Sequence, residues 1–171
     1  MNIILTEIGY FGPPILFLML IYLTIERNTK PRNKRIANEN TAKHDKMQAY
    51  VICTYIILWQ TLNYALNETL KHIFQQARPK DIPYINSWDS PPHLGRYGMP
   101  SGHAQQVVSE ATYIIVAFQN PYSSILSIIV AALTIYQRYI YQKHTAIQLV
   151  VGAIVGVFTG GTFYSFISNK L

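Results

Sequence analysis

Three of the fourteen Lys and Arg residues and two of the five histidines in this 171-residue sequence could together bind a phosphate group and transfer it. The cations are Lys71, Arg78 and Arg138, and the histidines are His103 and His144. Arginine binds phosphate oxygens in a bidentate manner, and lysine acts as a point charge. Two histidines suit phosphoryl transfer, because one ring can attack phosphorus while the other protonates the leaving oxygen.

A Pro-Ser-Gly turn directly precedes the first of these histidines. Ser101 and Gly102 open a predicted helix, so backbone N–H groups, the helix dipole and the Ser101 hydroxyl add donors for an anion. Gly102 has no side chain, which lets the backbone approach a phosphate closely. We therefore add both residues to the candidate phosphate site.

Apolar segments about 20 residues long, the length that spans a bilayer, must position these residues. We expect five such helices, over residues 3–25, 47–70, 101–118, 123–141 and 145–167. Half of the sequence is apolar and 13% is charged, whereas charged residues make up about a quarter of a typical soluble domain. The prediction is an all-α, multi-pass transmembrane helical bundle of about five spanning helices, forming a single domain over residues 1–171.

The distribution of positive charge predicts the orientation of this bundle. Seven of the fourteen Lys and Arg residues lie between Arg27 and Lys46, so we expect this loop to be cytoplasmic. The irregular segment 71–100 and the short connection 142–144 then share the opposite face. Counting the crossings brings the candidate residues together on that non-cytoplasmic face. The basic residues form no stripe with interleaved aromatic residues, so we expect no nucleic-acid partner.

Further expectations concern the packing of the helices. Pro13 and Pro14 should kink the first helix. Polar residues of the second helix should face the bundle interior, with Glu68 pairing with Lys71. Small residues of the last helix should permit close packing; these are Gly152, Ala153, Gly156, Gly160 and Gly161.

Three stretches of the sequence together resemble the type 2 phosphatidic acid phosphatase superfamily: KHIFQQARP, PSGH and RYIYQKH. The resemblance covers residues 71–148. It implies that His144 is the nucleophile that forms a phosphohistidine and that His103 is the general acid. It also implies a metal-independent enzyme without a cofactor, and a phosphate-binding set of Lys71, Arg78, Ser101, Gly102 and Arg138.

One position departs from the pattern of that family, whose third motif continues to an aspartate four residues after the histidine. Here that position is Gln148, which shares a helix face with His144 and could hold its ring without adding negative charge. We place Gln148 with the catalytic residues. A less stabilised cationic intermediate favours a better leaving group, such as the phosphate monoester that a diphosphate releases. Glu110, seven residues after His103, is a candidate substitute for the missing carboxylate.

The stretches YGMPSGHAQQ and KHTAIQLVVGAIVG resemble dolichyl-diphosphate phosphatases. This resemblance implies hydrolysis of a polyprenyl (dolichyl) diphosphate to the monophosphate and phosphate. Two alternatives stay open: a broader lipid phosphatase acting on phosphatidate or undecaprenyl diphosphate, and a catalytically degenerate membrane protein that binds phospholipid.

The expected partners are the bilayer and the lipid substrate, and the oligomeric state is left open. In a eukaryotic or viral source we expect the endoplasmic reticulum membrane with a lumenal active site. In a bacterial source we expect the plasma membrane.

Overall fold

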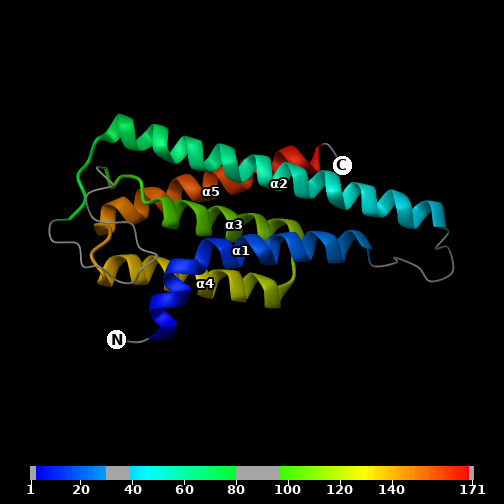
Figure 1. Ribbon diagram of the computed structural model, residues 1–171, viewed down its shortest axis with the longest axis horizontal. Coiled ribbons are helices and arrows are strands. Elements are labelled where there is room, and N and C mark those ends of the chain that lie inside the picture. Colours follow the sequence, from blue (N-terminus) through cyan, green and yellow to red (C-terminus); the bar gives the residue numbers. More distant parts are fainter. Residues whose placement is uncertain (1–2, 30–38, 80–96, 170–171) are drawn as a thin grey trace.

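The computed structural model describes residues 3–29, 39–79 and 97–169. In these ranges the chain forms five helices: α1 (Ile3–Thr29), α2 (Glu39–Phe74), α3 (Gly102–Phe118), α4 (Pro121–Ile140) and α5 (Ala146–Ser168). The described residues contain no strand beyond one isolated antiparallel bridge between Ala77 and Tyr97. The helices run roughly side by side along the long axis of the molecule (Figure 1). The predicted all-α bundle is therefore confirmed.

Local capping explains why three of these helices begin where they do. The Ser101 hydroxyl accepts the backbone N–H of Ala104 at the start of α3. Asn120 caps α4, which has Pro121 in its first turn, and Thr145 forms a capping box with Gln148 at the start of α5. These side chains satisfy N–H groups that have no partner within the helix.

Within the described residues, four helices are long and apolar enough to cross a membrane: Gly9–Thr29 of α1, Lys43–Phe74 of α2, and the whole of α4 and α5. The remaining helix, α3, has 17 residues, or about 25 Å of length, and packs against α1, α4 and α5. Side chains such as Leu18 and Phe158, 65% and 71% exposed, point outward, as expected for a lipid-facing surface. The chain is an integral membrane protein.

The second helix is longer than predicted. It begins at Glu39 rather than near residue 47 and has 36 residues, which corresponds to about 54 Å. This exceeds a hydrocarbon core of about 30 Å, so α2 extends beyond the bilayer. The prediction was wrong here because the polar first turns of a helix carry no apolar pattern. Much of the predicted basic loop, residues 30–38, lies outside the described residues.

Small residues bring α5 against α3, as predicted. A Cβ atom on Gly152, Gly156 or Gly160 would lie 2.3–2.6 Å from a backbone oxygen of α3 or of Ser101 just before it. Gly161, also in the predicted set, has no other atom within 4 Å of such a Cβ. The close approach of α5 to α3 therefore depends on the spacing of Gly152, Gly156 and Gly160 at every fourth residue, and not on the total number of glycines.

Glycines also allow close packing of α1 on α4. A Cβ on Gly9 would meet Gln137 side-chain atoms at 2.2 Å, and one on Gly12 would meet Thr134 at 1.9 Å. Just beyond, Pro13 and Pro14 lie inside α1, and the start of α1 bends away from the rest of the helix (Figure 1). A proline ring removes a helical hydrogen bond and displaces the preceding turn. The predicted kink is confirmed.

The apolar core occupies the half of the bundle nearer the α1 C-terminus. Trp59 of α2 stacks on Phe163 of α5 with ring centroids 4.5 Å apart, and Tyr113 of α3 packs beside both rings. Leu16 and Ile114 are fully buried in the same cluster. At the other end, the start of α1, the end of α2, the start of α3, the end of α4 and the start of α5 come together (Figure 1). This second region contains the candidate site.

Candidate active site

A cavity of about 280 Å³ lies where these helix ends meet. Six of the eight predicted site residues line it: Lys71, Arg78, Gly102, His103, Arg138 and His144. The other two, Ser101 and Gln148, are fully buried. Gln148 contacts the His144 side chain, and Ser101 donates its backbone N–H to the Gln148 carbonyl. Side chains from positions 71 to 148 are thus brought to one end of the bundle, as the count of membrane crossings predicts.

His144 is held by its Nδ1 atom. That atom lies 2.9 Å from the Gly98 carbonyl oxygen and 3.3 Å from Gln148 Oε1. Both partners are acceptors, so Nδ1 carries the proton and Nε2 carries the lone pair. This is the tautomer that a nucleophilic Nε2 needs, in a ring that is 5% exposed.

The protonation state of His144 follows from its surroundings. Burial and the nearby Arg78 and Arg138 charges lower the pKa of His144 to about 3, against opposing hydrogen bonds to Gln148 and Gly98. The ring is therefore neutral at physiological pH. A neutral imidazole keeps the lone pair with which it can attack phosphorus.

Gln148 does more than reach the His144 ring. Its Oε1 also accepts the Thr145 N–H at 3.2 Å, and its Nε2 donates to the Ala77 carbonyl at 2.8 Å and to Gln76 Oε1 at 3.1 Å. The predicted contact with His144 is confirmed, and the structure adds a reason for an amide. A carboxylate has no proton to donate, so it would face the Ala77 carbonyl without a hydrogen bond.

The three cationic side chains differ in the groups that they contact. Arg138 is 4% exposed, and its Nη2 lies 2.7 Å from His103 Nε2. Because a guanidinium only donates, His103 accepts this hydrogen bond through Nε2. Lys71 pairs with Glu68 at 2.6 Å, as predicted. Arg78 follows the end of α2 and makes a long 3.5 Å contact from Nε to the Tyr97 carbonyl.

The Pro-Ser-Gly turn is fixed from two sides. The Ser101 N–H donates to the Gln148 carbonyl at 3.0 Å, while its side chain caps α3 and is absent from the lining of the cavity. A Cβ on Gly102 would lie 3.1 Å from Asn67 Oδ1. The missing side chain therefore also makes room for α2. Whether Ser101 contributes to phosphate binding stays a prediction.

A buried amide network sets the position of this turn relative to α2. Asn67 Nδ2 donates to Gln105 Oε1 at 2.8 Å, and Gln105 Nε2 donates to Asn63 Oδ1 at 2.7 Å. Asn63 and Asn67 are 4% and 3% exposed, which confirms that this polar face of α2 points inward. Buried polar groups with satisfied partners hold a site rigidly.

Glu110 does not take the place of the missing aspartate. It is fully buried and accepts a hydrogen bond from Gln60 of α2. Seven residues along α3 correspond to about 10 Å, which is too far for a hydrogen bond to His103. The hypothesis that Glu110 substitutes for the carboxylate was wrong, because sharing a helix face does not bring two residues into contact.

Two site residues were missed by sequence reasoning. Gly98 supplies the carbonyl that holds His144, and a Cβ there would lie 2.6 Å from Gln148 Oε1 and 2.9 Å from Arg78 Cγ. Tyr10 of α1 packs over Arg138, with 5.3 Å from its ring centre to the guanidinium carbon, and its ring lies 5.9 Å from the His103 ring. Gly98 falls within the YGMPSGH stretch, whereas no pattern marks Tyr10.

The described residues contain no group of three or more His, Cys, Asp or Glu side chains placed to hold a metal ion. The irregular segment 71–100 is described only at its ends, since residues 80–96 lie outside the described ranges.

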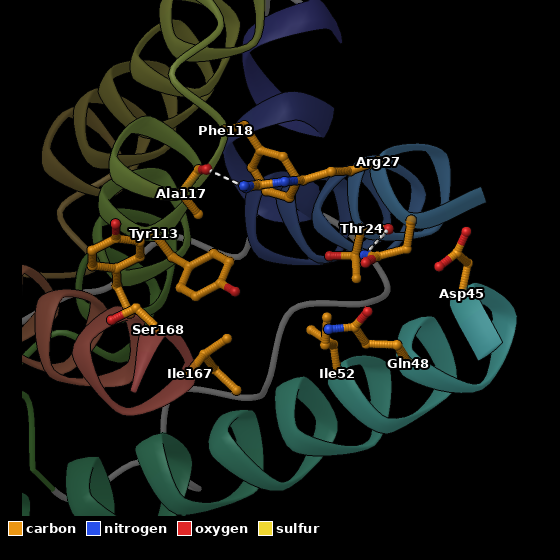
Figure 2. Close-up of a pocket in the computed structure, with 12 residues that line it drawn as sticks. Thr24, Arg27, Asp45, Gln48, Ile52, Tyr113, Ala117, Phe118, Ile167 and Ser168 are labelled. Carbon is orange, nitrogen blue, oxygen red and sulfur yellow. Dashed lines mark hydrogen bonds between the residues drawn. The ribbon is translucent and has the colours of Figure 1, made fainter. Parts of the chain in front are cut away.

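A second cavity, of about 400 Å³, lies at the opposite end of the bundle. Figure 2 shows Arg27 of α1 reaching toward Ala117 and Phe118 of α3, with Asp45 and Gln48 of α2 across from it. Arg27 donates to the Ala117 carbonyl at 2.5 Å. None of the described residues that line this cavity is a histidine.

Comparison with known proteins is consistent with the geometry of the site. A family model described as the PAP2 superfamily matches residues 48–171. Lipid A 4'-phosphatase of Bacteroides thetaiotaomicron is 30% identical over 130 residues, which is 70% of this chain and 56% of that protein. The chain thus spans little more than half the length of this relative.

A solved structure is also similar. The crystal structure of the first transmembrane PAP2 type phosphatidylglycerolphosphate phosphatase from Bacillus subtilis matches with a TM-score of 0.62 and 17% identity. The match covers 98% of this chain and 77% of that chain. At this level of identity the likeness shows the fold alone.

Proposed function

The chain belongs to the PAP2 superfamily, and on that premise we propose that it is a membrane lipid phosphatase working through a phosphohistidine on His144. The observation that carries the proposal is the state of this ring. Its Nδ1–H is bound by two acceptors, so Nε2 offers a lone pair in a cavity that three cations also line. A nucleophile and an anion site are thereby combined.

In the proposed first step, His144 Nε2 attacks the terminal phosphorus. An N–P bond forms, the bond from phosphorus to the leaving oxygen breaks, and Lys71, Arg78 and Arg138 stabilise the charge on the phosphoryl oxygens. The product lipid leaves after its oxygen gains a proton. Water then attacks the phosphohistidine, releases inorganic phosphate and restores the neutral ring.

His103 is proposed to supply the proton to the leaving oxygen and later to accept one from the attacking water. In the structure its Nε2 accepts a hydrogen bond from Arg138. A bound phosphate attracts the guanidinium toward its own oxygens, which frees Nε2 for a proton. The phosphate charge also favours the imidazolium form. Binding would therefore convert His103 from an acceptor into an acid.

The proposed substrate is a polyprenyl (dolichyl) diphosphate, hydrolysed to the monophosphate. Gln148 supports this choice, because a neutral amide stabilises a cationic phosphohistidine less than a carboxylate would. A diphosphate compensates, since its leaving group is a phosphate monoester and not an alkoxide.

A second candidate is a phosphomonoester lipid. The relative from Bacteroides is a lipid A 4'-phosphatase and the solved neighbour is a phosphatidylglycerolphosphate phosphatase. Both names favour a substrate whose phosphate is attached to a sugar or glycerol. The location would be the plasma membrane in a bacterial source, or the endoplasmic reticulum with a lumenal site in a eukaryotic or viral one.

The test compares phosphate release from polyprenyl diphosphate, phosphatidate and phosphatidylglycerolphosphate by the purified protein in lipid. We expect the diphosphate to have the highest kcat/KM. Equal rates, or a preference for a monoester, would remove the diphosphate assignment.

A pair of variants tests the phosphatase assignment itself. His144→Ala should lower phosphate release at least about 10³-fold, because removing a nucleophile disables the catalytic unit. His44, an exposed histidine at the opposite end of the bundle, provides the matched control His44→Ala, which should keep wild-type activity. Full activity in the His144 variant would contradict the phosphohistidine route.

A further inference from the structure

A groove opens beside the phosphate cavity along the first helix. This α1 groove has a volume of about 470 Å³ and is lined by aromatic residues and prolines of α1, by Gln60 of α2, and by His103 and Gln106 of α3. Three of these residues, Tyr10, His103 and Gln106, also line the phosphate cavity. The two spaces therefore adjoin at the ring proposed to protonate the leaving group.

The chemistry of the α1 groove contrasts with that of the cavity. Lys71, Arg78 and Arg138 line the cavity, whereas the described residues of the groove include no Asp, Glu, Lys or Arg. Its two glutamines are already engaged, since Gln60 donates to Glu110 and accepts from Gln106. Tyr10 and His103 form the wall at the junction with the cavity. Phe11, Pro13, Pro14 and Phe17 form the rest, and their side chains favour hydrocarbon over polar groups.

The backbone of α1 fixes this shape before any ligand arrives. Gly9 and Gly12 seat the helix tightly on α4, and the kink at Pro13 and Pro14 follows immediately. Tyr10 is held over the Arg138 guanidinium at 5.3 Å. A preformed groove lowers the entropic cost of ordering a flexible chain.

From this juxtaposition we propose that the α1 groove binds the hydrocarbon chain of the substrate next to its phosphate, with Phe17 setting the preference for chain length. The inference rests on the proposed phosphatase function and narrows its substrate class. The carbons nearest the phosphate or diphosphate would be hydrocarbon, as in a prenol, and not a sugar. Selection of the hydrocarbon chain would then depend on α1, which precedes the residues 48–171 that match the family model.

Photo-crosslinking tests where the chain lies, independently of turnover. The probe is a long-chain prenyl diphosphate with a diazirine within the first few carbons, added to the full-length protein in phosphatidylcholine vesicles. We expect adducts on residues 10–17, reduced by an excess of the same lipid without the diazirine. Adducts confined to other helices would overturn the groove assignment, even if the protein hydrolyses no substrate.

Kinetics test whether Phe17 selects the chain. Phe17→Ala should lower the ratio of kcat/KM for a long-chain over a short-chain diphosphate by about tenfold or more, the effect expected for lost apolar contact in a pocket. Leu18→Ala on the outward face, where the side chain is 65% exposed, should keep the wild-type ratio. Phe17→Leu provides a milder variant and should give an intermediate ratio.

The outcomes separate the two proposals. A fall in activity toward long and short chains by the same factor in both Phe17 variants would overturn the groove assignment and leave the phosphatase function intact. No phosphate release from any lipid by the wild-type protein would refute the phosphatase function, and the crosslinking map would still decide the groove.

Discussion

Each end of the helical bundle places an arginine over an aromatic ring beside a cavity. At the site end, Arg138 of α4 lies 5.3 Å from the Tyr10 ring centre and 2.7 Å from His103 Nε2. At the far end, Arg27 of α1 lies 5.9 Å from the Phe118 ring centre and donates to the Ala117 carbonyl (Figure 2). The two arginines are placed similarly, but Arg138 donates to an imidazole ring and Arg27 donates to a backbone carbonyl.

The hydrogen-bond partner, and not the presence of a cavity, therefore determines what an arginine can do. A backbone carbonyl at the end of α3 is a fixed acceptor, so Arg27 stabilises a helix terminus. An imidazole ring can gain a proton and exchange partners, so in the proposed mechanism Arg138 moves to a phosphate and changes the protonation state of His103. Burial adds to the contrast, because Arg138 is 4% exposed and Arg27 lies at the surface.

Removing each arginine in turn tests this contrast with the largest expected effect. Arg138→Ala should lower kcat/KM by about 10²–10³-fold, the loss typical of one group that stabilises transition-state charge. Arg27→Ala should keep kcat/KM within about twofold and lower only the melting temperature. Similar losses of kcat/KM in both variants, measured by phosphate release, would remove the distinction between the ends.

The Gln148 amide connects the start of α5 to the residues after α2, because it donates to Gln76 and Ala77. Gln148→Leu should lower kcat by about tenfold, an effect within the range measured when a group orienting a functional side chain is lost. The loss is limited because the Gly98 carbonyl still holds Nδ1 of His144. Gln148→Glu should raise the rate on a monoester relative to a diphosphate. An unchanged ratio of the monoester rate to the diphosphate rate would show that the Gln148 amide does not determine the leaving-group preference.

Acid should weaken the site end through His144. The pKa of His144 is about 3 in the folded protein and about 6.5 in an unfolded chain. The unfolded state therefore binds the proton first, and stability falls as the pH decreases from about 6.5 toward 3. Between pH 7 and 5 this amounts to about 2 kcal/mol at 1.36 kcal/mol per pH unit.

Unfolding in detergent at pH 7 and 5 measures this loss. His144→Gln should show a pH dependence smaller than that of the wild-type protein. His44→Gln, at the far end, serves as the control and should behave like wild type. Identical pH dependence in all three proteins would contradict the low pKa of His144.

A further contrast concerns two glycines of α5, Gly152 and Gly161, whose surroundings differ. A Cβ on Gly152 would lie 2.6 Å from the Ser101 carbonyl oxygen, whereas Gly161 faces open space. Gly152→Ala should therefore cost about 1–3 kcal/mol, the usual cost of overpacking, and should lower activity by displacing the Pro-Ser-Gly turn. Gly161→Ala should change neither. Equal melting temperatures for the two variants would show that α3 shifts freely.

Much of the site could be predicted from the sequence because helix length and the number of crossings determine which ends meet. Lys71, Arg138 and His144 lie near helix ends that alternate in direction, so a bundle brings them together. The contact between Gln148 and His144 followed from a spacing of four residues. Both inferences depend on regular helical geometry, which a sequence encodes in its apolar periodicity.

The parts that could not be predicted depend on backbone atoms and on packing between helices. The Gly98 carbonyl holds His144, but every residue has a carbonyl, so no residue type marks its role. Tyr10 reaches Arg138 only because Gly9 and Gly12 let α1 pack closely on α4. Glu110 was assigned to the wrong network because periodicity gives the helix face and not the partner across from it.

Trapping the phosphoenzyme tests the central proposal most directly. The wild-type protein would be mixed with a polyprenyl diphosphate labelled in its terminal phosphate, quenched in base within the first turnover and digested for mass spectrometry. Phosphohistidine should appear at His144 and decay as inorganic phosphate is released, while His103→Ala should change its lifetime without moving the label. Phosphate release with no label on His144, or with the label on His103, would contradict the account.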